Sequence, residues 1–203
     1  MSNLSLLHPR GKVLFAEGEP ARGVFVLRSG KAAVSISSSE GRLVILRLAQ
    51  AGDVLGLNAV LRNSPHETTV KTLGSCRTDY ISRDQLLELM HKSKLAADAV
   101  VKILSYELTE LTNRTRLLLL PQTALGRLAK LLLEWSKETA TNGSQAGRID
   151  RDFTQEEIAQ MICSSRETVT RLLARLSRRQ LIRMNSDSIL ICDHAALETI
   201  ALS

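Results

Sequence analysis

Twenty-seven consecutive residues, 93–119, contain neither glycine nor proline. Mostly apolar side chains recur through them at alternating spacings of four and three, which is the heptad seam of a helix packed along another helix. The seam consists of Ala97, Val101, Leu104, Leu108, Leu111, Thr115 and Leu118. Either an identical helix or the helix's own domain can cover this seam. Its length favours a homodimer with contacts over residues 97–118.

The residues before this helix have the pattern of strands and turns. Glycines at positions 11, 18, 23, 30, 41, 52, 56 and 74 separate short apolar and β-branched runs. The runs cover 13–15, 24–27, 33–36, 43–46, 68–70 and 80–81, and residues 38–41 have the composition of a hairpin tip. Such a pattern predicts an all-β barrel or jelly roll. Aromatic residues make up 3% of the chain, so Leu, Ile and Val must build the core.

Composition excludes several classes of protein. Cys76, Cys163 and Cys192 are too few and too scattered for a disulfide scaffold or a cysteine-rich zinc site. No run approaches the ~20 apolar residues of a membrane span. The first residues show no signal peptide, so we expect a cytoplasmic protein. The 27 basic and 21 acidic residues give a net charge of +6, which permits a polyanionic partner.

Residues 154–178 predict two short helices joined by a tight turn. Thr154 and Glu157 have the spacing of a capping box, and a second helix follows the break at 163–165. The second helix carries an apolar stripe of Val169, Leu172, Leu173 and Leu176. Residues 181–184 and 189–192 flank a polar turn and predict a strand–turn–strand wing. Together these elements predict a winged helix-turn-helix.

The polar face of the second helix suits the major groove of DNA. Arg166, Glu167, Thr170 and Arg171 lie opposite the stripe, and residues 163–183 contain six arginines against one acid. Arginine matches the O6 and N7 acceptors of guanine, and glutamate accepts from the N4 amine of cytosine. The alternative is a solvated face with a Glu167–Arg171 ion pair. The cap, turn, stripe and wing together favour DNA binding.

The region between the long helix and the capping box predicts a further helix and a loop. Pro121 ends or kinks the long helix, and Thr123 can cap the next helix. The apolar face of that next helix carries Leu125, Leu128, Leu131, Leu132 and Trp135. Residues 138–147 are polar and small, so we expect a loop there. The predicted parts are a β-roll over 1–92, a dimerisation helix over 93–120 and a DNA-binding domain over 121–203, with a hinge near 120–121.

These motifs resemble the cyclic-AMP receptor protein / fumarate-nitrate regulator (CRP/FNR) superfamily. Residues 155–161 (QEEIAQM) and 165–173 (SRETVTRLL) resemble its helix-turn-helix, and residues 11–19, 25–30 and 51–56 resemble its cyclic-nucleotide-binding β-roll. The resemblance covers about residues 8–193. It implies an α+β fold with a jelly roll, a long dimerisation helix and a winged helix-turn-helix.

The resemblance also implies a function. The protein would be a homodimeric transcription regulator that binds a palindrome with TGA-containing (TGTGA-like) half-sites and has RNA polymerase as a partner. The implied DNA contacts are Ser165, Arg166, Glu167, Thr168, Thr170, Arg171 and Arg175. Thr170 stands where one branch of the family has glycine and the other serine, which leaves the outer base preference open. No catalytic motif is present, so we expect no enzymatic activity.

The pattern around Gly56 departs from the cyclic-AMP-binding members of the family. Those members have a glutamate after this glycine and an arginine–serine pair for the phosphate, whereas this chain has Leu57 and Glu67–Thr68. A carboxylate at position 67 would repel the phosphate. Thr112 matches a family adenine contact, and Asn113 follows it. We therefore predict regulation without cyclic AMP, or by an unidentified ligand in this altered pocket.

The sequence bears on three other means of sensing, namely an iron–sulfur cluster, haem and a thiol. Iron–sulfur members carry N-terminal cysteines, and residues 1–75 contain none. Haem needs an axial ligand, but we interpret all four histidines as surface or loop residues, so we expect no metal and no cofactor. These are His8, His66, His91 and His194. Cys163 lies in the predicted turn, where oxidation would add bulk beside the DNA. A structural role for Cys163 as a small turn residue is favoured over control of DNA binding by oxidation of its thiol.

Overall fold

A computed structural model describes residues 4–38, 40–119, 123–141, 147–150 and 153–202. The chain divides into two units, Met1–Arg114 and Thr115–Ser203, and the long helix α3 (Lys94–Leu119) crosses the boundary. The predicted hinge at 120–121 and part of the predicted loop, 142–146, lie outside the described residues. In the described part of the chain, no helix combines the length and apolarity needed to cross a membrane.

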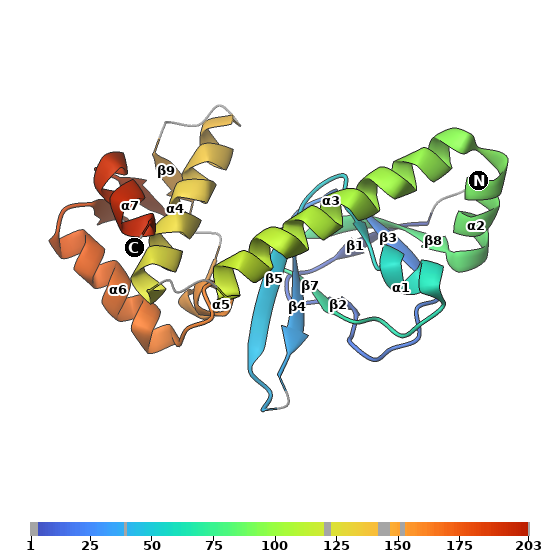
Figure 1. Ribbon diagram of the computed structural model, residues 1–203, viewed down its shortest axis with the longest axis horizontal. Coiled ribbons are helices and arrows are strands. Elements are labelled where there is room, and N and C mark those ends of the chain that lie inside the picture. Colours follow the sequence, from blue (N-terminus) through green and yellow to red (C-terminus); the bar gives the residue numbers. More distant parts are fainter. Residues whose placement is uncertain (1–3, 39, 120–122, 142–146, 151–152, 203) are drawn as a thin grey trace. The chain divides into compact units, whose positions relative to one another are not determined.

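Eight short strands of the N-terminal unit form two antiparallel four-stranded sheets (Figure 1). Six of the strands overlap the predicted runs, namely β2 (Val13–Phe15), β3 (Gly23–Ser29), β4 (Ala32–Ser37), β5 (Leu43–Ala49), β7 (Thr69–Thr72) and β8 (Cys76–Ser82). The sequence did not predict β1 (Leu4–His8) or β6 (Val54–Leu55). The strand orders are β1-β8-β3-β6 and β2-β7-β4-β5. The predicted jelly roll is therefore confirmed.

The predicted hairpin joins β4 to β5. These strands pair antiparallel from Ala32–Ala49 to Ser37–Leu43, with one irregularity between Val34 and Ser35. At the tip, the backbone N–H of Gly41 donates to the Ser38 carbonyl at 2.9 Å. Gly41 has φ 76°, a left-handed conformation that glycine adopts without steric cost.

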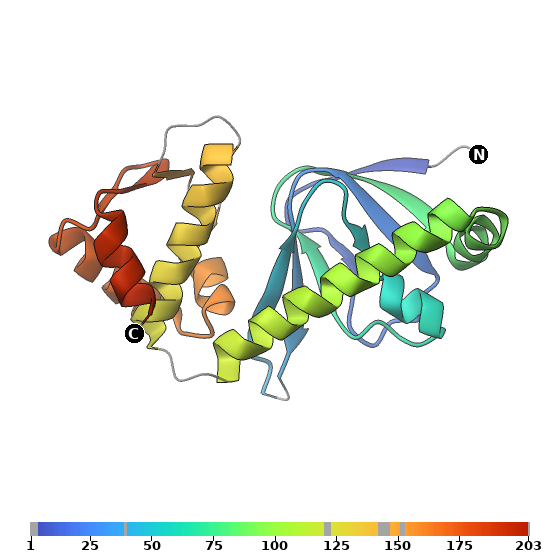
Figure 2. The same cartoon turned by 45° about the horizontal axis from the view of Figure 1, so that its top comes forward.

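Mostly aliphatic side chains fill the space between the sheets, in keeping with the low aromatic content. The first buried cluster consists of Phe15, Leu27, Ala32, Val34, Ala49, Leu55, Val70 and Cys76. A second cluster joins the roll to the helices α1 (Leu57–Arg62), α2 (Arg83–Lys92) and α3. Its members are Val24, Leu57, Val60, Leu86 and Val100, with Ile103 and Leu104 packed against them. Figure 2 shows α3 running along the roll.

The heptad seam of α3 divides between two environments. Leu104 packs into the second cluster. By contrast, Val101, Leu108 and Leu111 are 61%, 67% and 50% exposed. One side of the helix thus covers its own domain, while an apolar stripe along it stays uncovered in the single chain.

The C-terminal unit combines four helices with a small sheet among the described residues. They are α4 (Ala124–Thr141), α5 (Gln155–Met161), α6 (Arg166–Arg178) and α7 (His194–Ala201), with a sheet in the order β10 (Ile182–Met184), β11 (Ser188–Ile191), β9 (Arg148–Asp150). The N–H of Gly126 donates to Thr123 Oγ1 at 3.0 Å, which agrees with the predicted cap.

Two expectations for this unit were wrong or incomplete. Residues 138–141 were expected in a loop but belong to α4. They contain no glycine or proline, and polar residues alone do not end a helix. The strand β9 and the helix α7, which packs on α4, were not predicted.

Candidate nucleic-acid interface and ligand cavity

The predicted capping box opens α5. Thr154 Oγ1 accepts from the N–H of Glu157 at 3.1 Å, and Glu157 Oε2 accepts from the N–H of Thr154 at 2.7 Å. These two bonds satisfy backbone donors that the first turn of a helix leaves free. The helix therefore begins at a position set by local sequence.

The turn between α5 and α6 depends on a left-handed residue. Cys163 has φ 51°, an uncommon conformation for a residue with a side chain. The next N–H, of Ser164, donates to the Ala159 carbonyl at 2.9 Å, and Ser165 then caps α6 by accepting from the N–H of Thr168. Cys163 is half-buried, which fits the predicted role of a small turn residue.

The two faces of α6 differ as predicted. The stripe of Val169, Leu172, Leu173 and Leu176 is buried, with Val169 and Leu176 at 0% exposure. Of the seven predicted DNA contacts, six are exposed: Ser165, Arg166, Glu167, Thr170, Arg171 and Arg175. Thr168 is half-buried because it lies against the cap, where the Ser165 hydroxyl donates to its Oγ1 at 3.1 Å.

The charged side chains on the exposed face of α6 do not pair with one another. Among the residues that the structure describes, Arg166 and Arg171 form no ion pair, and Glu167 does not pair with Arg171. The pKa of Glu167 is lowered, chiefly by a hydrogen bond from its own backbone N–H. Glu167 therefore stays ionised and able to accept. This arrangement disfavours the alternative of a salt-bridged face.

One contact on this face was not predicted. The hydroxyl of Thr170 donates to Gln155 Oε1 at 2.5 Å and lies 2.9 Å from the Arg166 carbonyl oxygen. Gln155 is the first residue of α5, so the contact joins the two helices across 15 positions of sequence. A separation of that size gives no local signal in the sequence.

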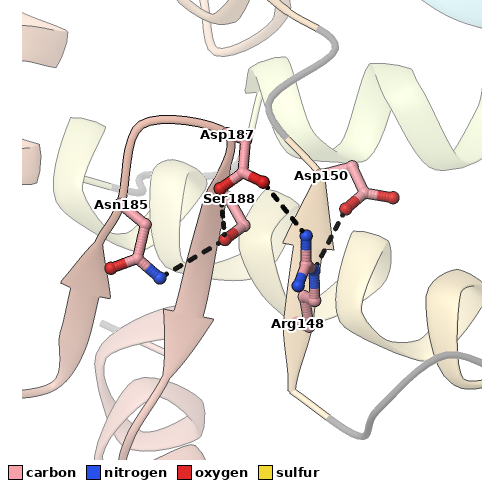
Figure 3. A network of polar contacts seen from close by, with 5 residues as sticks. All are labelled: Arg148, Asp150, Asn185, Asp187 and Ser188. Carbon is pink, nitrogen blue, oxygen red and sulfur yellow. Dashed lines mark hydrogen bonds and ion pairs between the residues drawn. The ribbon is translucent and has the colours of Figure 1, made fainter.

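The wing is held by a polar network at its tip (Figure 3). Asn185 donates through its backbone to the Ser188 carbonyl at 2.8 Å. Arg148, from β9, contacts Asp150 at 3.3 Å and Asp187 at 3.4 Å. These pairs are exposed and contribute little stability, but Arg148 offsets part of the negative charge of Asp150 and Asp187.

The altered pocket is a cavity of about 390 Å³ in the N-terminal unit. Gly56, Leu57, Glu67 and Thr68 all line it, as predicted for the pocket. Thr112 and Asn113 do not. They are exposed on α3, where Thr112 Oγ1 donates to the Leu108 carbonyl at 2.9 Å.

The two sequence departures have clear structural effects. Leu57 is 1% exposed and belongs to the core, so it offers no polar group to a ribose. Glu67 Oε1 accepts from Arg62 at 3.1 Å and from Asn58 at 3.2 Å. A phosphate placed here would meet an arginine that already holds a carboxylate. Arg62 thus offsets part of the expected repulsion, but its charge is shared with Glu67.

A second arginine on the cavity wall is also paired. Arg47 contacts Asp53 at 2.7 Å and Glu107, on α3, at 3.0 Å. Burial raises the pKa of Glu107, and Arg47 opposes this effect. The network links the roll to α3 beside the cavity. Arg62 and Arg47 on the cavity wall therefore both have carboxylate partners.

The interpretation of the histidines as surface or loop residues was wrong for His8, which is in β1, whereas His66 lies in a loop but is buried. His8 is buried and bonded to Thr78 Oγ1 at 2.9 Å. His66 is 5% exposed and stacks on Phe15 with ring centroids 3.8 Å apart. Burial lowers the pKa of both histidines. Within the described ranges, no cluster of three His, Cys, Asp or Glu side chains could hold a metal.

Comparisons with known proteins agree with this architecture. Residues 7–93 match the model of the cyclic nucleotide-binding domain, and residues 126–200 match that of the Crp-like helix-turn-helix domain. The structure of FixK2 from Bradyrhizobium japonicum superposes with a TM-score of 0.84 over 98% of both chains, at 20% identity. That likeness shows the fold.

Sequence relatives show the family. The chain is 31% identical over 189 residues to the CRP-like cAMP-activated global transcriptional regulator of Mycobacterium tuberculosis, covering 93% of this chain and 84% of the relative. It is 26% identical to the fumarate and nitrate reduction regulatory protein of Vibrio cholerae, covering 95% and 76%. The chain therefore belongs to the CRP/FNR family of transcription regulators and carries the family's DNA-binding helix-turn-helix.

Proposed function

We propose that this regulator binds, as a homodimer in the cytoplasm, a palindrome with TGA-containing (TGTGA-like) half-sites, and that RNA polymerase is its partner there. The observation that carries the proposal is the exposed face of α6, where Arg166, Glu167 and Arg171 are free of mutual ion pairs. Arginines on this face can bond guanine in the major groove, and an ionised glutamate can accept from cytosine.

The uncovered stripe of α3 supports the homodimer. Val101 and Leu108 lie seven residues apart, two turns along one side of the helix, and both are more than half exposed. A second copy would bury both stripes by the same contacts. Dimerisation also explains a palindromic site, since two symmetric recognition helices need half-sites about 34 Å apart.

Two arginine variants test whether α6 reads sequence. We expect Arg171→Ala to cost about 1–3 kcal/mol on a TGTGA palindrome and to relax specificity at one base pair. Arg178→Ala, at the far end of the helix, should weaken palindromic and scrambled duplexes alike and reduce the salt slope by about one. Fluorescence anisotropy at several salt concentrations measures both effects. Identical losses for the two variants on both duplexes would contradict base reading by Arg171.

We further propose that cyclic AMP is not the effector. Leu57 and the Glu67–Arg62 pair support this, because neither position offers a free group to a sugar–phosphate ring. Micromolar cyclic AMP should then leave the thermal midpoint and the DNA affinity unchanged. A rise in either quantity would refute the proposal.

A ligand-switched regulator is the second candidate, favoured by the cavity itself. A volume of about 390 Å³ lies within the usual range of ligand pockets. Selective DNA binding by the ligand-free protein would exclude a requirement for such an effector.

A further inference from the structure

We propose that Thr170 reads the 5-methyl group of a thymine, because its hydroxyl is held within the helix-turn-helix and its methyl group is left to face the DNA. This inference rests on the proposed DNA binding and assigns the base preference that the sequence motifs leave open. Gln155 acts as the positioning residue.

The hydroxyl of Thr170 has two partners inside the protein. Its Oγ1 lies 2.5 Å from Gln155 Oε1 and 2.9 Å from the Arg166 carbonyl oxygen. A hydroxyl has one hydrogen to donate. If the Gln155 amide is turned over, Nε2 donates to Oγ1 and Oγ1 donates to the Arg166 carbonyl, which satisfies all three groups. In either arrangement, the hydroxyl could donate to a base edge only by giving up one of these bonds.

The same contacts select the side-chain rotamer. Threonine in a helix divides between two rotamers, and a bond from Oγ1 to the carbonyl one turn earlier selects one of them. Thr170 is exposed on the face that also carries Arg166 and Arg171. With Oγ1 directed to α5 and to its own helix, the methyl group is the part of the side chain available to a base.

Gln155 is itself held in place. It is half-buried and shares the lining of a small hollow with Trp135 and Phe153, whose rings stack with centroids 4.6 Å apart. Its partial burial beside this aromatic pair limits the positions that the amide can take. The contact with Thr170 is therefore part of the fold of the two helices.

A methyl group and a hydroxyl select bases differently. A free hydroxyl can donate or accept, so it distinguishes bases poorly, whereas a methyl group packs on the C5-methyl of thymine. The inference thus predicts a preference for thymine at one position of each half-site. That preference should depend on the single C5-methyl group.

The test removes one methyl group from each side of the contact. Duplexes selected by the wild-type protein from a random pool are synthesised with each half-site thymine replaced in turn by deoxyuridine, which lacks the methyl group. At one position, wild-type affinity should fall about fourfold, the effect of one methyl-sized group leaving a buried contact. Thr170→Val keeps the methyl group and should show the same loss. Thr170→Ser keeps the hydroxyl and should show none.

Other outcomes distinguish a failure of thymine reading by Thr170 from a failure of the proposed DNA binding. If Thr170→Ser keeps the deoxyuridine penalty, a group other than the Thr170 methyl contacts the thymine and the inference is wrong. If Thr170→Val abolishes the preference, the hydroxyl reads the base and the inference is also wrong. Gln155→Ala frees the Thr170 side chain to rotate. The loss of affinity caused by deoxyuridine should therefore be smaller for this variant than for the wild type. An unchanged penalty would exclude Gln155 as the positioning residue. If the wild-type protein selects no sequence from the pool, the proposed function itself fails.

Discussion

The uncovered stripe of α3 gives a prediction whose size follows from the structure. Leu108 is 67% exposed in the single chain, so the proposed dimer would bury about two-thirds of a leucine side chain. Full burial of leucine contributes about 1.5–3 kcal/mol, which makes this share about 1–2 kcal/mol per copy. A symmetric interface contains the contact twice. Leu108→Ala should therefore weaken dimerisation by about 2–4 kcal/mol, or roughly 30-fold to several-hundred-fold in Kd.

Sedimentation equilibrium over a range of protein concentrations measures this dimer Kd. The control is Leu95→Ala, on the same helix but outside the seam, where the leucine is 82% exposed. We expect the control to dimerise as the wild type does. At protein concentrations where the wild type is monomeric, both variants should unfold near the wild-type temperature, because neither leucine belongs to the core of the single chain. A wild-type monomer, or a Leu108→Ala variant with unchanged Kd, would refute dimerisation through this stripe.

Two further predictions concern stability. Thr154→Ala removes the cap of α5 and should cost about 1 kcal/mol in the free energy of unfolding of the C-terminal unit, measured in urea. Thr199→Ala, at an exposed position of α7, should be nearly neutral. If both cost the same, the capping box does not stabilise the unit. Burial lowers the pKa of His66 from its ordinary 6.5. As pH falls below about 6.5, the unfolded chain therefore binds a proton at this histidine more readily than the folded chain does. The free energy of unfolding then decreases as the pH falls. His66→Gln should show a smaller drop in Tm between about pH 7 and about pH 5, and an equal drop would contradict this assignment.

The helix-turn-helix could be predicted because its signals are local. The capping box spans four residues, and the apolar stripe repeats within one helix, so both survive in the sequence alone. The wing was predicted for the same reason, since its two strands are neighbours along the chain. The capping contacts and the buried stripe both agree with the prediction.

The elements that were missed depend on distant partners. The strand β1 pairs with β8 more than 60 residues away, and β9 has three residues and adds to the edge of the wing. The burial of His66 against Phe15 also joins separate parts of the roll. Short segments of this kind take their structure from tertiary packing, which no local pattern records.

In the candidate sites, residue types were predictable but pairings were not. Glu67 was recognised as a departure from the family, yet its contact with Arg62 appears only in the fold. Thr112 matches the family pattern but does not line the cavity of the single chain. The partner of Thr170 lies 15 residues away on another helix. Each pairing depends on the fold of a whole unit.

The most direct test of sequence reading by α6 is a ligand-free titration of the reduced wild-type protein. Fluorescence anisotropy compares a TGTGA palindrome with a scrambled duplex of the same length at fixed physiological salt. We predict nanomolar binding to the palindrome and affinity at least about a thousandfold weaker for the scrambled duplex. Equal affinity for the two duplexes would contradict the account.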